Sequence, residues 1–170
     1  MERRHLSRVA LVLALGACSP DTADRPPAPT APTLARQGTE LPFHGTLAAE
    51  ETGQFDPATN RILIHLQGAG TATHLGQYQL VMNLSLNPAV GTAVGRLVLT
   101  AADGSTLTAD VTGFAPATPN DVFVIVETAT ITGGTRRFAG ATGRFVIERT
   151  ITRSTGVSSG AFDGNISLGK

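Results

Sequence analysis

Apolar and polar residues alternate with a period of two along most of the chain from Phe43 onward. In the clearest segment, residues 77–86, every second position is apolar: Tyr78, Leu80, Met82, Leu84 and Leu86. Successive side chains of a strand point to opposite sides of the sheet, so an extended strand places this set on one face. The segment is therefore predicted to be a strand with one buried face.

Seven further segments show the same period, and Gly, Asn, Asp and Pro residues separate them, as is typical of antiparallel strands. They are Phe43–Glu51, Arg61–Gly68, Val94–Ala101, Thr106–Phe114, Val122–Thr132, Gly143–Arg153 and Ser158–Leu168. Eight strands with short connections favour an all-β fold, an eight-stranded antiparallel up-and-down (calycin-like) barrel over residues 42–170. A two-sheet sandwich is the main alternative. A barrel of this size is either filled by side chains or holds one small ligand.

The first 17 residues have the layout of a secretory signal peptide: arginines at positions 3, 4 and 8, an apolar stretch over 9–17, and small residues before Cys18. Leu15-Gly16-Ala17-Cys18 resembles the lipobox of bacterial lipoproteins. The resemblance implies cleavage before Cys18, a diacylglycerol on its sulfur and a further acyl chain, such as palmitate, on the new amino terminus. A plain secretory signal with an incidental cysteine is the alternative.

Residues 18–41 contain several prolines and no apolar periodicity, so they are predicted to form a disordered, flexible linker between the lipidated Cys18 and the barrel. The predicted location is the bacterial cell envelope, with the protein anchored to the lipid bilayer. The sorting rule of bacterial lipoproteins implies that Ser19 after the cysteine directs the protein to the outer membrane, facing the periplasm or the cell surface, if the host has two membranes.

Composition narrows the function classes. The 13 basic and 13 acidic residues balance, and only 15% of residues are charged, so the basic face that nucleic-acid binding requires is not expected. The single cysteine excludes an internal disulfide. We expect no cofactor and no metal, and the sequence does not indicate an oligomeric state.

Three segments carry a resemblance to a known family. The run Thr130–Phe145 reads TITGGTRRFAGATGRF, residues 70–76 read GTATHLG, and residues 99–107 read LTAADGSTL. In their order along the chain these segments resemble bacterial proteins with an allene oxide cyclase-like, dirigent-like barrel, over roughly residues 43–168. Arg136 stands where that family usually has Gly. The eukaryotic relatives cyclise an unstable epoxide or steer the coupling of phenoxy radicals, but no catalytic residue of theirs maps onto this chain.

Two oppositely charged residues are predicted to point into the barrel. Glu127 and Arg149 each occupy the apolar face of their strand, and their midpoint in sequence is Phe138, so they are predicted to lie directly opposite each other. Buried charges must be paired. The pair is either a structural ion pair or a polar anchor in a ligand pocket. Arg96 and Tyr78 are added as candidate ligand-binding residues on predicted inward faces.

Other candidate chemistry is weaker. His44 and His65 are interpreted as possible cross-strand neighbours on the surface, but a metal site needs more ligands. His74 is predicted to orient the second turn through a hydrogen bond. The glycines of residues 133–143 permit a tight turn that folds Phe138 back as a plug under one barrel end. The same run lacks the Lys-Ser/Thr ending of a phosphate loop.

These observations favour a membrane-anchored, extracytoplasmic barrel that binds a small apolar ligand or a partner and is not an enzyme. A cyclase- or isomerase-like enzyme and a purely structural envelope protein are the alternatives. Both ligand binding and catalysis require space inside the barrel.

Overall fold

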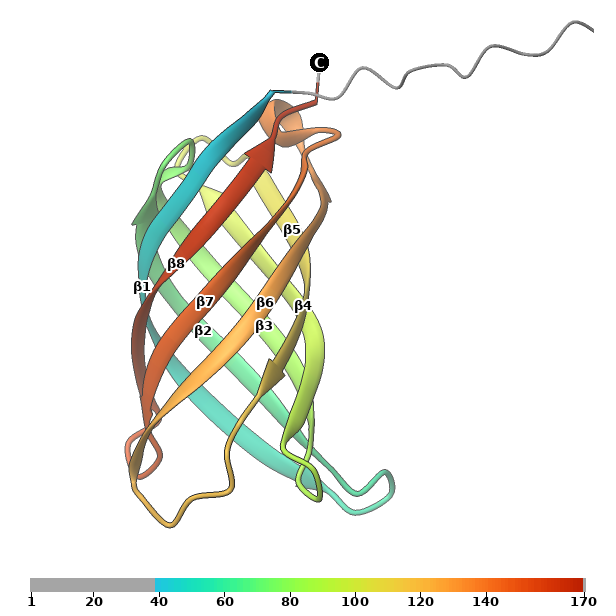
Figure 1. The fold of residues 1–170 in the computed structure, drawn as a ribbon, viewed down its shortest axis with the longest axis vertical. Coiled ribbons are helices and arrows are strands. Elements are labelled where there is room, and N and C mark those ends of the chain that lie inside the picture. The colour runs from blue at the N-terminus through green and yellow to red at the C-terminus, as the bar shows by residue number, and fades with distance from the viewer. Residues whose placement is uncertain (1–38, 170) are drawn as a thin grey trace, which may run out of the picture. The chain divides into compact units, whose positions relative to one another are not determined.

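The computed structural model describes residues 39–169, so the predicted signal peptide, the lipidated Cys18 and most of the predicted linker lie outside the described residues. Eight strands follow one another (Figure 1): β1 Glu40–Asp56, β2 Arg61–Ala72, β3 Gly76–Asn87, β4 Thr92–Ala101, β5 Thr106–Phe114, β6 Val122–Gly134, β7 Thr142–Thr152 and β8 Val157–Ser167. No helix among these residues is long and apolar enough to cross a membrane.

Every strand pairs antiparallel with its neighbours in sequence, and β1 pairs with β8 to close the barrel. The predicted up-and-down barrel is thus confirmed, and the two-sheet alternative is wrong. Strand β1 begins at Glu40, two residues before the predicted start of the barrel at residue 42, because Leu41 already pairs with Ile166 and is partly buried.

The middle of the barrel is filled by side chains from the inward faces of all eight strands. Phe43, Phe145 and Phe162 stack with ring centroids 5.0–5.1 Å apart, and Tyr78 lies 6.4 Å from Phe162. The remaining void at this level is about 10 Å³ and its lining is apolar. Such a space is too small for a ligand, so a small molecule cannot bind in the centre of the barrel.

The barrel end that carries the chain's C-terminus, at the top of Figure 1, is closed. A 3-10 helix, η1 (Arg136–Phe138), turns Phe138 inward, where it is only 1% exposed. The guanidinium of Arg137 lies 4.8 Å from the Phe138 ring centroid and donates a hydrogen bond to the carbonyl oxygen of Leu75. The predicted plug is confirmed.

Arg136 adopts the backbone conformation for which glycine is suited. Its φ is +53°, in the left-handed region that residues with a Cβ rarely adopt. Its guanidinium donates a 2.7 Å hydrogen bond to the carbonyl oxygen of Asp103 in the β4–β5 turn. The turn therefore keeps the shape that a glycine would favour, and the arginine adds a contact across to the neighbouring hairpin.

Candidate functional site at the open end of the barrel

A buried polar cluster centres on Arg149 of β7. Its Nε and Nη2 donate to the two carboxylate oxygens of Glu127 on β6, at 3.0 and 2.9 Å. Its Nη1 donates to Oε2 of Glu51 on β1 at 2.6 Å and to Oγ of Ser158 on β8 at 3.0 Å. Arg149, Glu127 and Ser158 are each 1% exposed, whereas the Glu51 side chain is 15% exposed. Four strands thus converge on one guanidinium.

The predicted inward orientation of Glu127 and Arg149 is confirmed, but the prediction that they lie directly opposite is wrong. Glu127 pairs with Ile147, and Arg149 pairs with Ile125, so the two charges are diagonal neighbours. Because Ile131 pairs with Gly143, the register centres on Arg137 rather than on Phe138. The long side chain of Arg149 spans this diagonal and still makes a bidentate contact with the Glu127 carboxylate.

Two glycines make room for this pair. A Cβ at Gly113, which pairs with Glu127, would lie 2.6 Å from Cγ of Glu127. A Cβ at Gly160, which pairs with Arg149, would lie 2.6 Å from Cα and 2.7 Å from Cβ of Arg149. Side chains at these positions would compete with the charged pair for the same interior space.

The cluster carries two carboxylates for one guanidinium. Burial lowers the pKa of Arg149, but the hydrogen bonds and charge of Glu127, followed by the charge and hydrogen bond of Glu51, outweigh this and raise its pKa above the usual value. Arg149 therefore stays protonated. Among the described residues, only Arg149 donates a hydrogen bond to the Glu51 side chain, so one carboxylate oxygen remains available to another donor.

A cavity of about 500 Å³ opens at the barrel end opposite η1, at the bottom of Figure 1. We call this cavity the mouth. Glu51 lies in its lining, so the buried cluster reaches the mouth through this carboxylate. The apolar side chains that line it include Ile62, Ile64, Leu86, Phe123, Ile125 and Ile151. A volume of this size with a largely apolar lining and a few polar groups is typical of small-molecule sites.

Arg153 is the other charged residue of the lining. Its guanidinium lies 4.8 Å from the ring centroid of Phe123, and both terminal nitrogens donate to the carbonyl oxygen of Thr118 at 3.2 Å. These contacts hold the β5–β6 loop against the barrel. Arg153 thus shapes the rim, whereas Glu51 presents a charge toward the interior.

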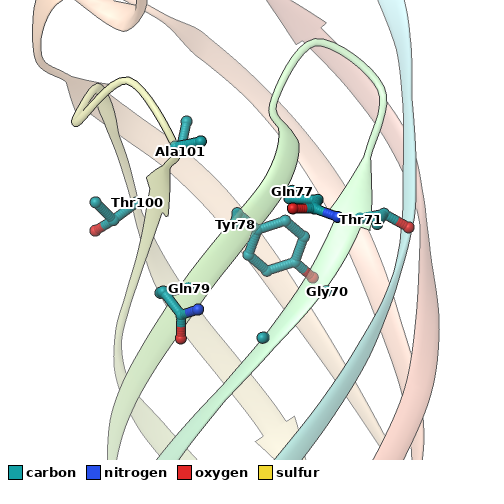
Figure 2. A pocket seen from close by; sticks show the side chains of 9 residues that line it. Gly70, Thr71, Gln77, Tyr78, Gln79, Thr100 and Ala101 are labelled. Carbon is teal, nitrogen blue, oxygen red and sulfur yellow. The ribbon is translucent and has the colours of Figure 1, made fainter.

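Tyr78 lies far from the mouth, near the closed end. Its hydroxyl donates to the carbonyl oxygen of Thr46 at 2.8 Å, and burial raises its pKa to about 12. The residue belongs to an open groove of about 590 Å³ between the β2–β3 and β4–β5 hairpins (Figure 2), where Gln77, Gln79 and Thr100 are also found. The groove is larger than the mouth, but its lining residues include no charged group.

Arg96 does not join the cluster, so its predicted inward orientation is wrong. Its side chain is 64% exposed, and its Nε lies 3.8 Å from Oδ1 of Asp110, which is equally exposed. Strand β4 carries apolar residues on both faces, and the inward set is Ala93, Leu97, Leu99 and Ala101. The alternation was therefore too weak to tell the two faces apart.

The histidines are separate from one another. His65 pairs with Thr52 rather than with His44, because β1 continues to Asp56 before the first turn, so the cross-strand pairing is wrong. Its Nδ1 lies 2.7 Å from Oδ1 of Asn83. His74 Nε2 lies 3.1 Å from the carbonyl oxygen of Pro42, which confirms the predicted hydrogen bond of the second turn. Residues 39–169 contain no group of three metal-ligating side chains.

Two members of the cluster, Glu51 and Ser158, were not predicted from the sequence. The alternation pattern did contain the information, because Glu51 lies two residues after Ala49 and therefore on the same inward face as Phe43, Leu47 and Ala49. Ser158 likewise precedes Phe162 by four residues on the inward face of β8. Extending the alternation to the ends of both strands would have placed them beside Arg149.

Comparison with known proteins supports the fold. No protein-family model matches the chain, and no curated protein matches it. Among solved structures, the pterocarpan synthase dirigent protein PsPTS1 is similar with a TM-score of 0.60 and 12% identity, over 79% of this chain and 99% of that chain. The pterocarpan synthase dirigent protein GePTS1 is similar with a TM-score of 0.58 and 15% identity, over 88% of this chain and 100% of that one. The chain has a dirigent-like barrel fold, and at such identities the likeness concerns the fold alone.

Proposed function

We propose that the protein is a lipid-anchored barrel of the bacterial cell envelope whose mouth binds a small, mainly apolar molecule that carries a hydrogen-bond donor. The observation that supports this is the 500 Å³ mouth with the Glu51 carboxylate in its lining. The filled centre and the plugged opposite end leave the mouth as the interior space large enough for a ligand in the described part of the chain.

The chemistry of the ligand follows from the lining. Apolar side chains from β2, β3, β6 and β7 favour an apolar body through burial of its surface. The free oxygen of Glu51 accepts a hydrogen bond from a hydroxyl or an amine of the ligand. Glu51 is itself held by Arg149, so the acceptor is fixed before the ligand arrives.

The ligand site is tested with the fluorescent amine N-phenyl-1-naphthylamine and a variant that fills the mouth. A Cβ at Gly53, which lines the mouth, has Ile62 Cγ2 as its only neighbour, at 3.4 Å, so a larger side chain enters the cavity without meeting backbone. We expect Gly53→Trp in the full chain to weaken probe binding about tenfold or more. Gln54→Trp, one position along on the outer face, is the matched control and should bind as the wild type does. Equal affinity of the two variants would refute the site.

The anchor is tested separately. Leu15-Gly16-Ala17-Cys18 and its single cysteine support lipidation at Cys18, and two or more acyl chains anchor a protein stably. In a bacterial host fed an alkyne analogue of palmitate, the wild type should be labelled and membrane-bound. Cys18→Ser should be unlabelled and should move to the soluble or precursor fraction. Labelling of this variant at the wild-type level would rule out the anchor.

A cyclase- or isomerase-like enzyme is the second candidate, and one observation favours it. Glu51 places a proton acceptor in the wall of a largely apolar cavity, and the buried Arg149 guanidinium behind it holds that acceptor in place, an arrangement suited to moving a proton. The molecule that co-purifies with the protein distinguishes the two candidates. If the protein is an enzyme, the wild type converts this molecule on incubation and the Glu51→Gln variant does not. If it is a binding protein, the molecule is recovered unchanged.

A further inference from the structure

Large apolar side chains that are exposed gather at the mouth end of the barrel. Among the described residues these side chains are between 45 and 57% exposed. All except Val146, in the middle of β7, lie in a turn at the mouth end or within five residues of a strand's end there. Single exposed apolar residues are ordinary, but their gathering around one opening is not, and such patches mark interaction surfaces.

Most of them form one continuous surface on one side of the mouth, which we call the apolar lip. It comprises Val90, Val94, Phe114, Val122, Val124 and Val126. Phe114 pairs with Val126 across β5 and β6. The β3–β4 turn joins this surface because the amide of Ala115 donates to the carbonyl oxygen of Gly91 at 2.8 Å. Pro88, Pro116 and Ala117 continue the lip into the lining of the mouth.

The lip contains no charged residue, and most charges beside it are already paired. Asp121 accepts hydrogen bonds from the amide and hydroxyl of Ser154 at 2.7 Å each. Arg96 lies beside Asp110. Glu148 of β7 pairs with Val126 of β6 and adds a negative charge at the edge of the lip. The lip therefore offers neither a basic cluster for anionic headgroups nor a charge pattern for a charged protein surface. It is suited to an uncharged, apolar medium.

We propose that the apolar lip docks on the surface of the bilayer, so that the mouth opens toward the lipid and its ligand passes between membrane and cavity without crossing water. This inference rests on the proposed function. Pro88, Pro116 and Ala117 belong to the mouth lining and lie close in sequence to the lip residues Val90 and Phe114, so the lip adjoins the entrance of the cavity. Half-exposed valines and a phenylalanine at the tip of a domain match the apolar side of interfacial anchors.

The length of the chain before the barrel permits this orientation. The segment from Cys18 to Glu40 contains the 39 − 18 = 21 residues 19–39, which span at most about 76 Å when extended. Strand β1 has 17 residues, about 56 Å along its own path, and it begins at the closed end. A lipid on Cys18 therefore does not prevent the mouth, at the far end of β1, from reaching the same bilayer.

Tryptophan placed on the lip tests the docking, because the chain has no tryptophan of its own. Val90→Trp changes a turn residue that is 57% exposed, and Phe114→Trp provides an independent second reporter. Thr130→Trp, on the exposed outer face of β6 near the closed end, is the control. The full chain is studied on neutral phosphatidylcholine vesicles with and without bromine on the acyl chains. Bromine quenches only a tryptophan that enters the lipid.

We expect both lip reporters to emit at shorter wavelength on vesicles and to lose roughly half or more of their intensity with brominated lipid, because interfacial side chains lie about 5–10 Å into the boundary region. Thr130→Trp should do neither. Lip reporters that bromine does not quench would overturn the proposal. So would a blue shift that depends on protein concentration rather than on lipid, which would assign the lip to a second copy of the chain. Probe binding to the mouth, measured with Gly53→Trp, reports separately on the proposed function.

Discussion

Replacing Arg149 by methionine tests whether the buried cluster is held by its charges. The guanidinium makes four hydrogen bonds to three side chains, and both it and Glu127 are 1% exposed. Arg149→Met leaves the Glu127 carboxylate buried with no partner, which typically costs about 3–5 kcal/mol. Because a domain of this kind is stable by only about 5–15 kcal/mol, the loss is a large share of the total.

The assay is urea unfolding followed by far-ultraviolet circular dichroism at pH 8. Arg144→Met on the exposed outer face of the same strand is the control and should change stability by less than about 0.5 kcal/mol. The double variant Arg149→Met with Glu127→Leu should recover most of the loss, because it removes both charges and fills the space with apolar groups.

If Arg149→Met is no less stable than Arg144→Met, the account of the cluster is wrong.

Three further predictions concern single positions. Tyr78 is the only tyrosine, so the ultraviolet absorbance of tyrosinate should titrate near pH 12 in the folded protein and near 10 in urea. Since the folded phenol keeps its proton longer, stability should fall as pH rises from 10 to 12, and a folded titration near 10 would contradict this burial. The variant Arg136→Gly should be more stable than Arg136→Ala by about 1 kcal/mol in urea unfolding, because φ is positive at this position. Equal stabilities of the two variants would argue against backbone strain at residue 136. Gly113→Ala should lower the free energy of unfolding by about 1–3 kcal/mol because the added Cβ meets Glu127, while Gly53→Ala should lower it much less. Similar losses in the two variants would show that the side chains around Gly113 can rearrange without loss of stability.

The strands and most of their inward faces were predictable because the alternation contrasts apolar with polar residues. The prediction failed where that contrast is missing. Strand β4 has Val94 and Val98 on its outer face and Leu97 on its inner face, so the pattern alone placed Arg96 on the wrong side. Tertiary packing decides such a strand, since one face must complete the interior while the other tolerates partly exposed valines.

Register and the mouth could not be read from the pattern in the same way. The midpoint between two residues predicts their pairing only if the centre of the turn is known. The predicted centre was wrong by one residue, so Glu127 was predicted opposite Arg149 although the two are diagonal neighbours. The mouth depends on how far the strands extend beyond their neighbours and on where the β5–β6 loop packs. These properties arise from contacts between segments distant in sequence, not from the local period.

Native mass spectrometry of the purified full chain tests the central claim, that the mouth holds a small molecule, most directly. The wild type and Gln54→Trp should carry an additional small mass that is released on unfolding, and Gly53→Trp, in which the mouth is filled, should lack it. A bound mass that is equally abundant in Gly53→Trp, or no bound mass in any of the three proteins, would contradict the account.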